Sequence, residues 1–181
     1  MSQPGEFSNA ILQTEGQPVT ALESVRDRFE PNSDRIAQLI GLLSTDEAWL
    51  QSSAAWLLRQ YCADGRYEFQ LSRASAAAIA RTLPALTDPW ARLHICQMLS
   101  CIPVPSRNAE QVARFVRACW EAPNTFLRAW AVDALYRLAG MHEKYLPEAM
   151  QLITDAAEDK AASIRARVRR LRAESDFADP M

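Results

Sequence analysis

The side chains best suited to catalysis are few and scattered along this sequence. Its two histidines, His94 and His142, have no carboxylate at a spacing typical of a catalytic dyad. The sequence also lacks a nucleophile triad, a glycine-rich phosphate loop and the HExxH pair of zinc enzymes. We therefore expect a protein that is not an enzyme and that has no cofactor and no metal site.

Aromatic and charged side chains that could bind a partner are placed more regularly. Trp56, Trp130, Asp133 and Arg137 lie on one flank of the expected helices, about a quarter turn from the apolar positions. Two interpretations are open. The rings pack between neighbouring helices, or Trp56 and Trp130 anchor a partner, because tryptophan and arginine dominate binding hot spots.

The last apolar segment carries arginines on one face. Arg167 and Arg170 lie beside Arg165, Arg169 and Arg172. This face is either the solvated side of a terminal helix or a docking patch for an acidic protein or for phosphates. The predicted partner-binding residues are Trp56, Trp130, Asp133, Arg137, Arg167 and Arg170.

These side chains belong to a repeated pattern. The same apolar spacing begins at Trp49, Trp90, Phe126 and Ser163, at intervals of 41, 36 and 37 residues. Periods of this size are typical of solenoids, in which each unit buries its apolar face against its neighbours. Three apolar columns result, with the members Leu50, Ala91, Leu127, Ile164; Ala54, Ile95, Ala131, Val168; and Leu57, Met98, Ala134, Leu171.

The pattern predicts an all-α chain of about four antiparallel helix pairs. We expect a flexible tail over residues 1–20, a repeat domain over 21–175 and a second tail over 176–181. The repeats are expected at about 34–62, 67–102, 107–140 and 142–175. Two further apolar columns end in Arg172 and Ser175, which predicts that the last unit has a polar outer face.

The segments "LPEAMQLITDAAEDKAASIRARVRRL", "DPWARLHICQML" and "NTFLRAWAVDAL" resemble HEAT repeats. The first has Leu-Pro in its first helix and Ile/Val-Arg near the start of its second, and the other two have an Asp or Asn cap followed by an arginine, through Asp88, Arg92, Asn124 and Arg128. The first repeat departs from this pattern, with Gln51 in place of Arg92, Arg128 and Arg165. The resemblance implies an α-solenoid with a right-handed superhelix, a fold used mostly to bind proteins and occasionally nucleic acid.

Composition limits the possible environments and partners. The net charge of −2 and the pI near 5.7 give no general attraction to nucleic acid. No apolar run is long enough to span a bilayer, and residues 1–20 lack the features of a secretory signal. The four cysteines lack metal-site spacing, and we expect them to be buried apolar side chains. We therefore expect a cytoplasmic protein.

Two functions from different classes remain open. The favoured one is a scaffold or adaptor that binds a protein or peptide along the second-helix face. The alternative is a DNA-binding or lesion-recognising protein resembling the HEAT-like alkylpurine glycosylases, suggested by Trp130 with Asp133. The bilin-lyase HEAT subunits offer a further resemblance, although no residue here specifically indicates a pigment.

Overall fold

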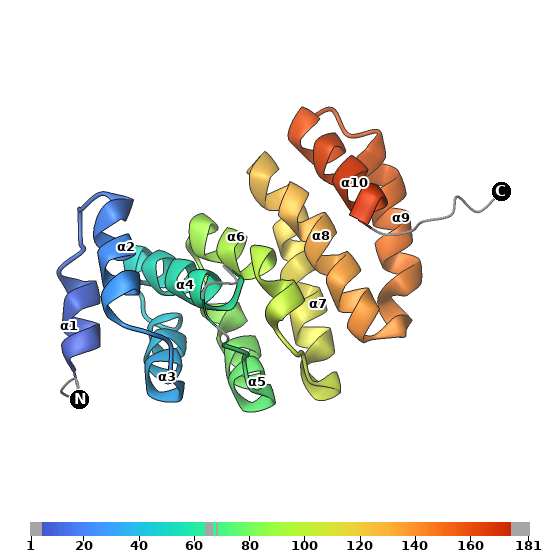
Figure 1. Cartoon of the computed structure of the whole chain (residues 1–181). Helices are drawn as coiled ribbons and strands as arrows, with labels where there is room; N and C mark the ends of the chain where they lie inside the picture. Colours follow the sequence, from blue (N-terminus) through green and yellow to red (C-terminus); the bar gives the residue numbers. More distant parts are fainter. Residues whose placement is uncertain (1–4, 64–66, 68, 175–181) are drawn as a thin grey trace.

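The computed structural model describes residues 5–63, 67 and 69–174, and every regular element in that part of the chain is helical (Figure 1). The predicted all-α class is confirmed. None of these helices is long and apolar enough to cross a lipid bilayer. In chain order the elements are α1 (Glu6–Leu12), α2 (Val19–Arg28), α3 (Ser33–Leu42), α4 (Ala48–Ala63), α5 (Arg73–Thr82), η1 (Leu83–Ala85), α6 (Pro89–Gln97), η2 (Leu99–Cys101), α7 (Ser106–Trp120), α8 (Thr125–Met141), η3 (Glu143–Tyr145), α9 (Leu146–Ala157) and α10 (Ala162–Glu174).

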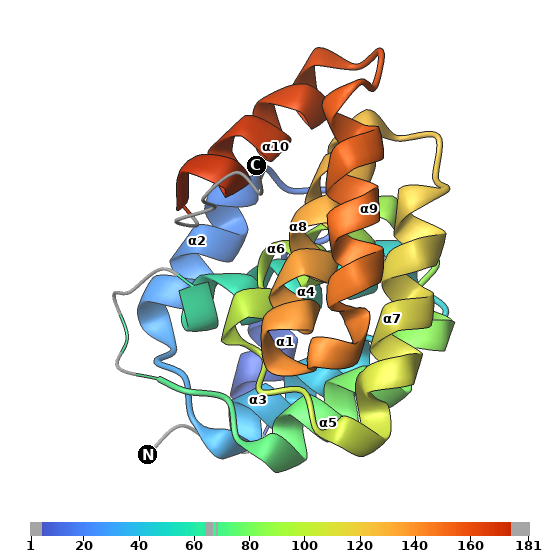
Figure 2. The same cartoon turned by 90° about the vertical axis from the view of Figure 1, so that its right-hand side faces the viewer.

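The helices form two layers along the molecule (Figure 1 and Figure 2). One layer holds α3, α5, α7 and α9, and the other, here called the second-helix layer, holds α2, α4, α6, α8 and α10. Within the second-helix layer each helix contacts the next one in chain order. The helices α3, α7 and α9 each also contact the helix that follows them in the chain. The packing order in space therefore follows the order of the sequence.

The apolar columns predicted from the repeat lie in the core. Every member of the three columns is buried, including Leu57, Met98 and Leu171, which have no exposed surface. Full burial of one such side chain stabilises a protein by about 1.5–3 kcal/mol. Contacts between successive second helices are therefore a major source of stability.

A buried glutamine, Gln51, connects α4 to the loop that precedes α6. The side-chain amide of Gln51 donates to the carbonyl oxygens of Thr45 and Ala85, at 2.8 and 2.9 Å. Its carbonyl oxygen accepts from the N–H groups of Thr87 and Asp88, at 3.0 and 3.2 Å. Gln51 stands where the later repeats have arginine, so this joint carries no charge.

The equivalent joint in the third repeat is ionic. Arg128 of α8 donates to Oδ2 of Asp159 at 2.6 Å, and Asp159 precedes α10. Arg128 also donates to the carbonyl oxygen of Trp120 at 3.2 Å and lies 4.5 Å from the centroid of that ring. Neighbouring helix pairs are thus joined by different chemistry along the chain.

For residues 5–20 the structure corrects the expected flexible tail, because α1 packs against the core; residues 1–4 lie outside the described residues. Phe7 and Ile11 lie one turn apart and are buried. The Phe7 ring meets the Phe29 ring edge-on, with 5.4 Å between centroids, and Ser8 donates to Gln38 at 2.7 Å. One apolar pair is too short a pattern to reveal a helix, and its packing partner lies much later in the chain.

The C-terminal end of the repeats has the polar character that the sequence predicts. Leu58, Leu99 and Leu135 are buried, whereas the equivalent Arg172 is exposed. Ser175 and the predicted tail over 176–181 lie outside the described residues. The exposed Arg172 is consistent with a unit that has one face in water.

The packing of α1 predicts a difference between two neighbouring residues. Ile11→Ala should destabilise the protein by about 2–5 kcal/mol, or less if α1 detaches locally, because it removes fully buried apolar contacts. Leu12→Ala is the matched control, since Leu12 is half exposed, and should change stability by no more than about 0.5 kcal/mol. Urea unfolding and amide hydrogen exchange of α1 measure both effects; equal changes would contradict the packing of α1.

Candidate functional site

Five of the six predicted partner-binding residues meet where α8 packs on α10. Trp130, Asp133 and Arg137 lie on one face of α8, because three- and four-residue spacings place side chains on the same side of a helix. Arg167 and Arg170 lie on α10, which contacts α8. Together with Glu174, these residues are called the α8–α10 cluster.

Asp133 lies at the centre of the α8–α10 cluster and is only 3% exposed. Its Oδ1 accepts a hydrogen bond from Nη2 of Arg167 at 2.9 Å and lies 3.6 Å from Nη2 of Arg137. A buried carboxylate requires cationic or hydrogen-bonding partners to offset the loss of water. Asp133 is therefore engaged within the chain and is not presented to a partner.

Glu174, which the sequence analysis did not select, completes the cluster. Its Oε2 accepts from Nη2 of Arg137 at 2.6 Å, and its Oε1 accepts from Nε of Arg170 at 2.9 Å. The pKa of Glu174 is lowered by hydrogen bonds from Arg170 and then from Arg137. Within the described residues, the buried Nε atoms of Arg137 and Arg167 have no hydrogen-bond partner. Two carboxylates thus offset most of the charge of three arginines.

Trp130 is covered by the side chain of Arg167. The guanidinium carbon of Arg167 lies 3.5 Å from the centroid of the Trp130 ring, and Trp130 is half-buried. Such cation–π contacts contribute about 0.5–2 kcal/mol, with the larger values at desolvated sites. Of the two interpretations that the sequence left open, this contact favours packing between helices for Trp130.

Trp56 lies apart from the α8–α10 cluster. It belongs to α4, which contacts α6, and α6 in turn contacts α8. The Trp56 ring is half-buried and lies 5.9 Å from the guanidinium carbon of Arg26 in α2. The structure therefore does not bring all six predicted residues into one site.

Two aromatic residues of the second-helix layer are more exposed than either predicted anchor. Trp90 is 55% exposed and Phe126 is 61% exposed. Each is the second residue of its helix and follows a side-chain cap: Asp88 accepts from the Ala91 N–H at 2.7 Å, and Asn124 accepts from the Phe126 N–H at 2.9 Å. We call Trp90 and Phe126 the exposed aromatic pair. Their place in the first turn is readable from the sequence, but their exposure depends on packing.

The two histidines make contacts within the chain. Nδ1 of His94 lies 3.1 Å from the side-chain oxygen of Gln97, and Nε2 of His142 lies 2.9 Å from the carbonyl oxygen of Val104. Burial lowers the pKa of His94, against a smaller raising effect of Gln97. His94 is therefore neutral near pH 7. Its side chain is partly buried in α6.

No protein-family model matches this chain, and neither the curated proteins nor the solved structures include a match.

The burial of Asp133 predicts a large effect of removing its charge. Asp133→Asn preserves the shape of the side chain but leaves Arg167 and Arg137 without their shared anion, which should destabilise the protein by about 3–5 kcal/mol. Glu174→Gln is the control, because Glu174 is partly exposed and its loss should cost no more than about 1 kcal/mol. Urea unfolding measures both; equal losses would show that Asp133 is not the centre of the cluster.

The Glu174 carboxyl should titrate below its ordinary value. Because its pKa in the folded state is lowered, its ion pairs stabilise the fold above the ordinary carboxyl pKa and are lost as pH falls through the folded-state value. Carbon NMR of the Glu174 carboxyl measures this pKa directly. Arg170→Gln should raise it, whereas Arg169→Gln, at an exposed residue, should not. An unchanged titration in Arg170→Gln would contradict the contact.

Proposed function

We propose that this chain is a short α-solenoid of about four HEAT-like helix pairs that acts as a non-enzymatic adaptor. Its binding surface for a protein or peptide is the second-helix layer. The supporting observations are the sequential contacts between second helices and the burial of every member of the repeated columns. Stacked helices of this kind provide an extended, rigid surface and need no catalytic group.

The observation that carries this proposal is the exposed aromatic pair. Trp90 and Phe126 hold equivalent positions in α6 and α8, two helices that pack against each other. A large aromatic side chain left in water forgoes a stabilisation of about 1.5–3 kcal/mol that burial against a partner recovers. Aromatic residues dominate the energetic centres of protein interfaces. These two rings are therefore the anchors for an apolar part of the partner.

The second-helix layer also carries exposed charge, on α10. The side chain of Arg170 is 71% exposed and keeps donors free beyond its bond to Glu174. Asp133 and Arg167, by contrast, hold α10 on α8 from inside. The partner that fits this layer presents apolar side chains to α6 and α8 and an acidic group to α10.

DNA binding has weaker support. A DNA-binding face needs arginines that are free to neutralise phosphates. In the α8–α10 cluster, Arg137 and Arg167 already pair with Asp133 and Glu174, and Arg170 keeps donors free. Trp130, which suggested a stacking role on a damaged base, lies under Arg167. The adaptor is therefore the better-supported function.

The exposed aromatic pair predicts the outcome of a comparative capture experiment. Proteins captured by the wild type should be reduced at least tenfold with the double variant Trp90→Ala and Phe126→Ala, since each anchor is expected to contribute about 2 kcal/mol. Leu146→Ala is the control, because Leu146 is also exposed but begins α9 in the other layer. Quantitative mass spectrometry of the captured proteins measures the change. Equal capture by the double variant would remove this surface from consideration.

Titration of a labelled DNA duplex distinguishes the alternative. The adaptor hypothesis expects no binding at low salt. Binding that weakens steeply as salt rises would instead support contacts to phosphates.

A further inference from the structure

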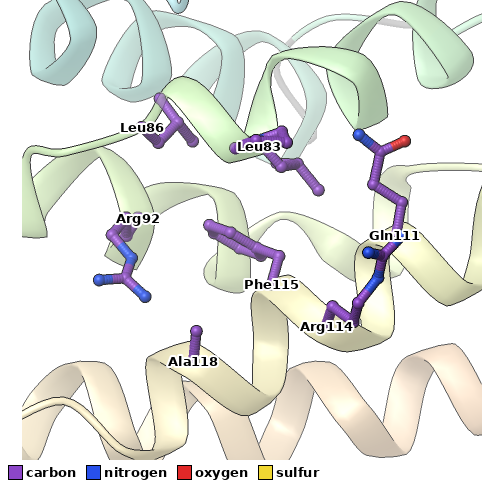
Figure 3. A pocket seen from close by; sticks show the side chains of 8 residues that line it. Leu83, Leu86, Arg92, Gln111, Arg114, Phe115 and Ala118 are labelled. Carbon is purple, nitrogen blue, oxygen red and sulfur yellow. The ribbon is translucent and has the colours of Figure 1, made fainter.

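A pocket opens where η1 and α6 face α7 (Figure 3). Its volume is about 380 Å³, which is within the range of small-molecule sites. Leu83, Leu86 and Phe115 supply an apolar lining. In Figure 3 Arg92 lies on one side of the Phe115 ring, and Arg114 lies on the other. The pocket therefore combines an apolar surface with positive charge.

Two arginines, Arg92 and Arg114, line this pocket. Within the described residues neither Arg92 nor Arg114 forms an ion pair, and no aspartate or glutamate lines the pocket. Arg92 lies 5.8 Å from the centroid of Phe115. Gln111 adds an amide to the same lining. Two uncompensated guanidinium groups favour a ligand that carries negative charge.

The repeat explains why Arg92 lacks a carboxylate. At the equivalent positions, Gln51 and Arg128 each bond to the loop before the next second helix. With the repeat interval of 37 residues, the position equivalent to Asp159 in the loop before α8 is Ala122, which has no charge to offer. Within the described residues Arg92 therefore has no carboxylate partner at this joint.

Together with a hydrogen bond with Cys96, the positive charge of Arg92 lowers the pKa of a neighbouring buried thiol, that of Cys119. The pKa of Cys119 is lowered, first by a hydrogen bond with Cys96 and further by the positive charge of Arg92, against the raising effect of burial. Cys119 is fully buried, so little water screens this charge.

The neighbouring groove between α7 and α9 has the opposite character. It has a similar volume of about 380 Å³, but Glu121, Glu148 and Asp155 line it. Its one arginine, Arg117, is held by both oxygens of Glu148, at 2.6 and 2.8 Å. Unpaired positive charge is therefore a specific property of the pocket beside Phe115 and not of both grooves.

We propose that the pocket formed by η1, α6 and α7 binds a small organic anion, with an apolar or aromatic body carrying a carboxylate or phosphate. The body packs on Phe115 and the two leucines, and the anionic group accepts hydrogen bonds from Arg92 or Arg114. None of the residues that line this pocket belongs to the exposed aromatic pair, and the proposal does not depend on the partner surface.

Phenyl phosphate is a suitable probe, with inorganic phosphate and phenol as its two halves. NMR titration should give saturable shifts for the amides around Phe115 and for the Nε–H groups of Arg92 and Arg114. Each half alone should bind at least about tenfold more weakly, because it lacks either the apolar contact or the charge-assisted hydrogen bonds. Benzoate in place of phenyl phosphate tests whether a carboxylate is preferred.

Variants locate the binding and keep the test independent of folding. Arg114→Gln, at an exposed residue, and Arg92→Gln should each weaken phenyl phosphate binding about tenfold. Arg169→Gln, on α10, should leave it unchanged. The proposal is overturned if neither phenyl phosphate nor benzoate gives a saturable shift at about 10 mM. It is also overturned if both pocket variants bind as the wild type does, or if inorganic phosphate binds as tightly as phenyl phosphate.

Discussion

Apolar contact between successive second helices is the interaction on which the rest of this structure depends. Leu57, Met98, Ala134 and Leu171 are buried, and α4, α6, α8 and α10 contact one another in chain order. The arrangement also determines which flank of each helix remains outside. The exposed aromatic pair and the α8–α10 cluster belong to these helices, and α6 contributes Arg92 to the pocket beside Phe115.

The α8–α10 cluster restricts the orientation of α10 on α8, because its polar contacts are directional and apolar packing is not. Moving Asp133 and its arginines out of water costs free energy that the ion pairs only partly recover, so the net contribution to stability is small. The geometry is nevertheless restrictive, because Arg167 must reach Asp133 while its guanidinium lies over Trp130. The polar contacts thus favour one rotation of α10 on α8.

Much of this fold could be predicted from the sequence, because the signal was repeated. The columns beginning with Leu50 and Leu57 are buried throughout, and the helix starts after Asp88 and Asn124 follow from their capping side chains. Helix α1 could not be predicted in the same way. Its apolar pair, Phe7 and Ile11, indicates a packed helix only when Phe29 is known to lie beside Phe7.

The candidate site was predictable in part, for a related reason. Helical spacing placed Asp133 and Arg137 on the same face of α8. It could not show that Arg167 would bind Asp133 or that Glu174 would bind Arg137. Whether these ion pairs form depends on how α8 and α10 are rotated against each other. Exposure of Trp90 depends in the same way on what the neighbouring helices leave uncovered.

The contrast between the Gln51 and Arg128 joints implies that the two ends of the protein respond differently to their surroundings. An amide that bonds to backbone groups keeps its contacts in acid and in concentrated electrolyte. The bond between Arg128 and Asp159 is weakened by both, since protons discharge the carboxylate and dissolved ions screen the attraction. Acidification or high ionic strength would therefore loosen the molecule from its C-terminal pair inward and leave the first repeats associated.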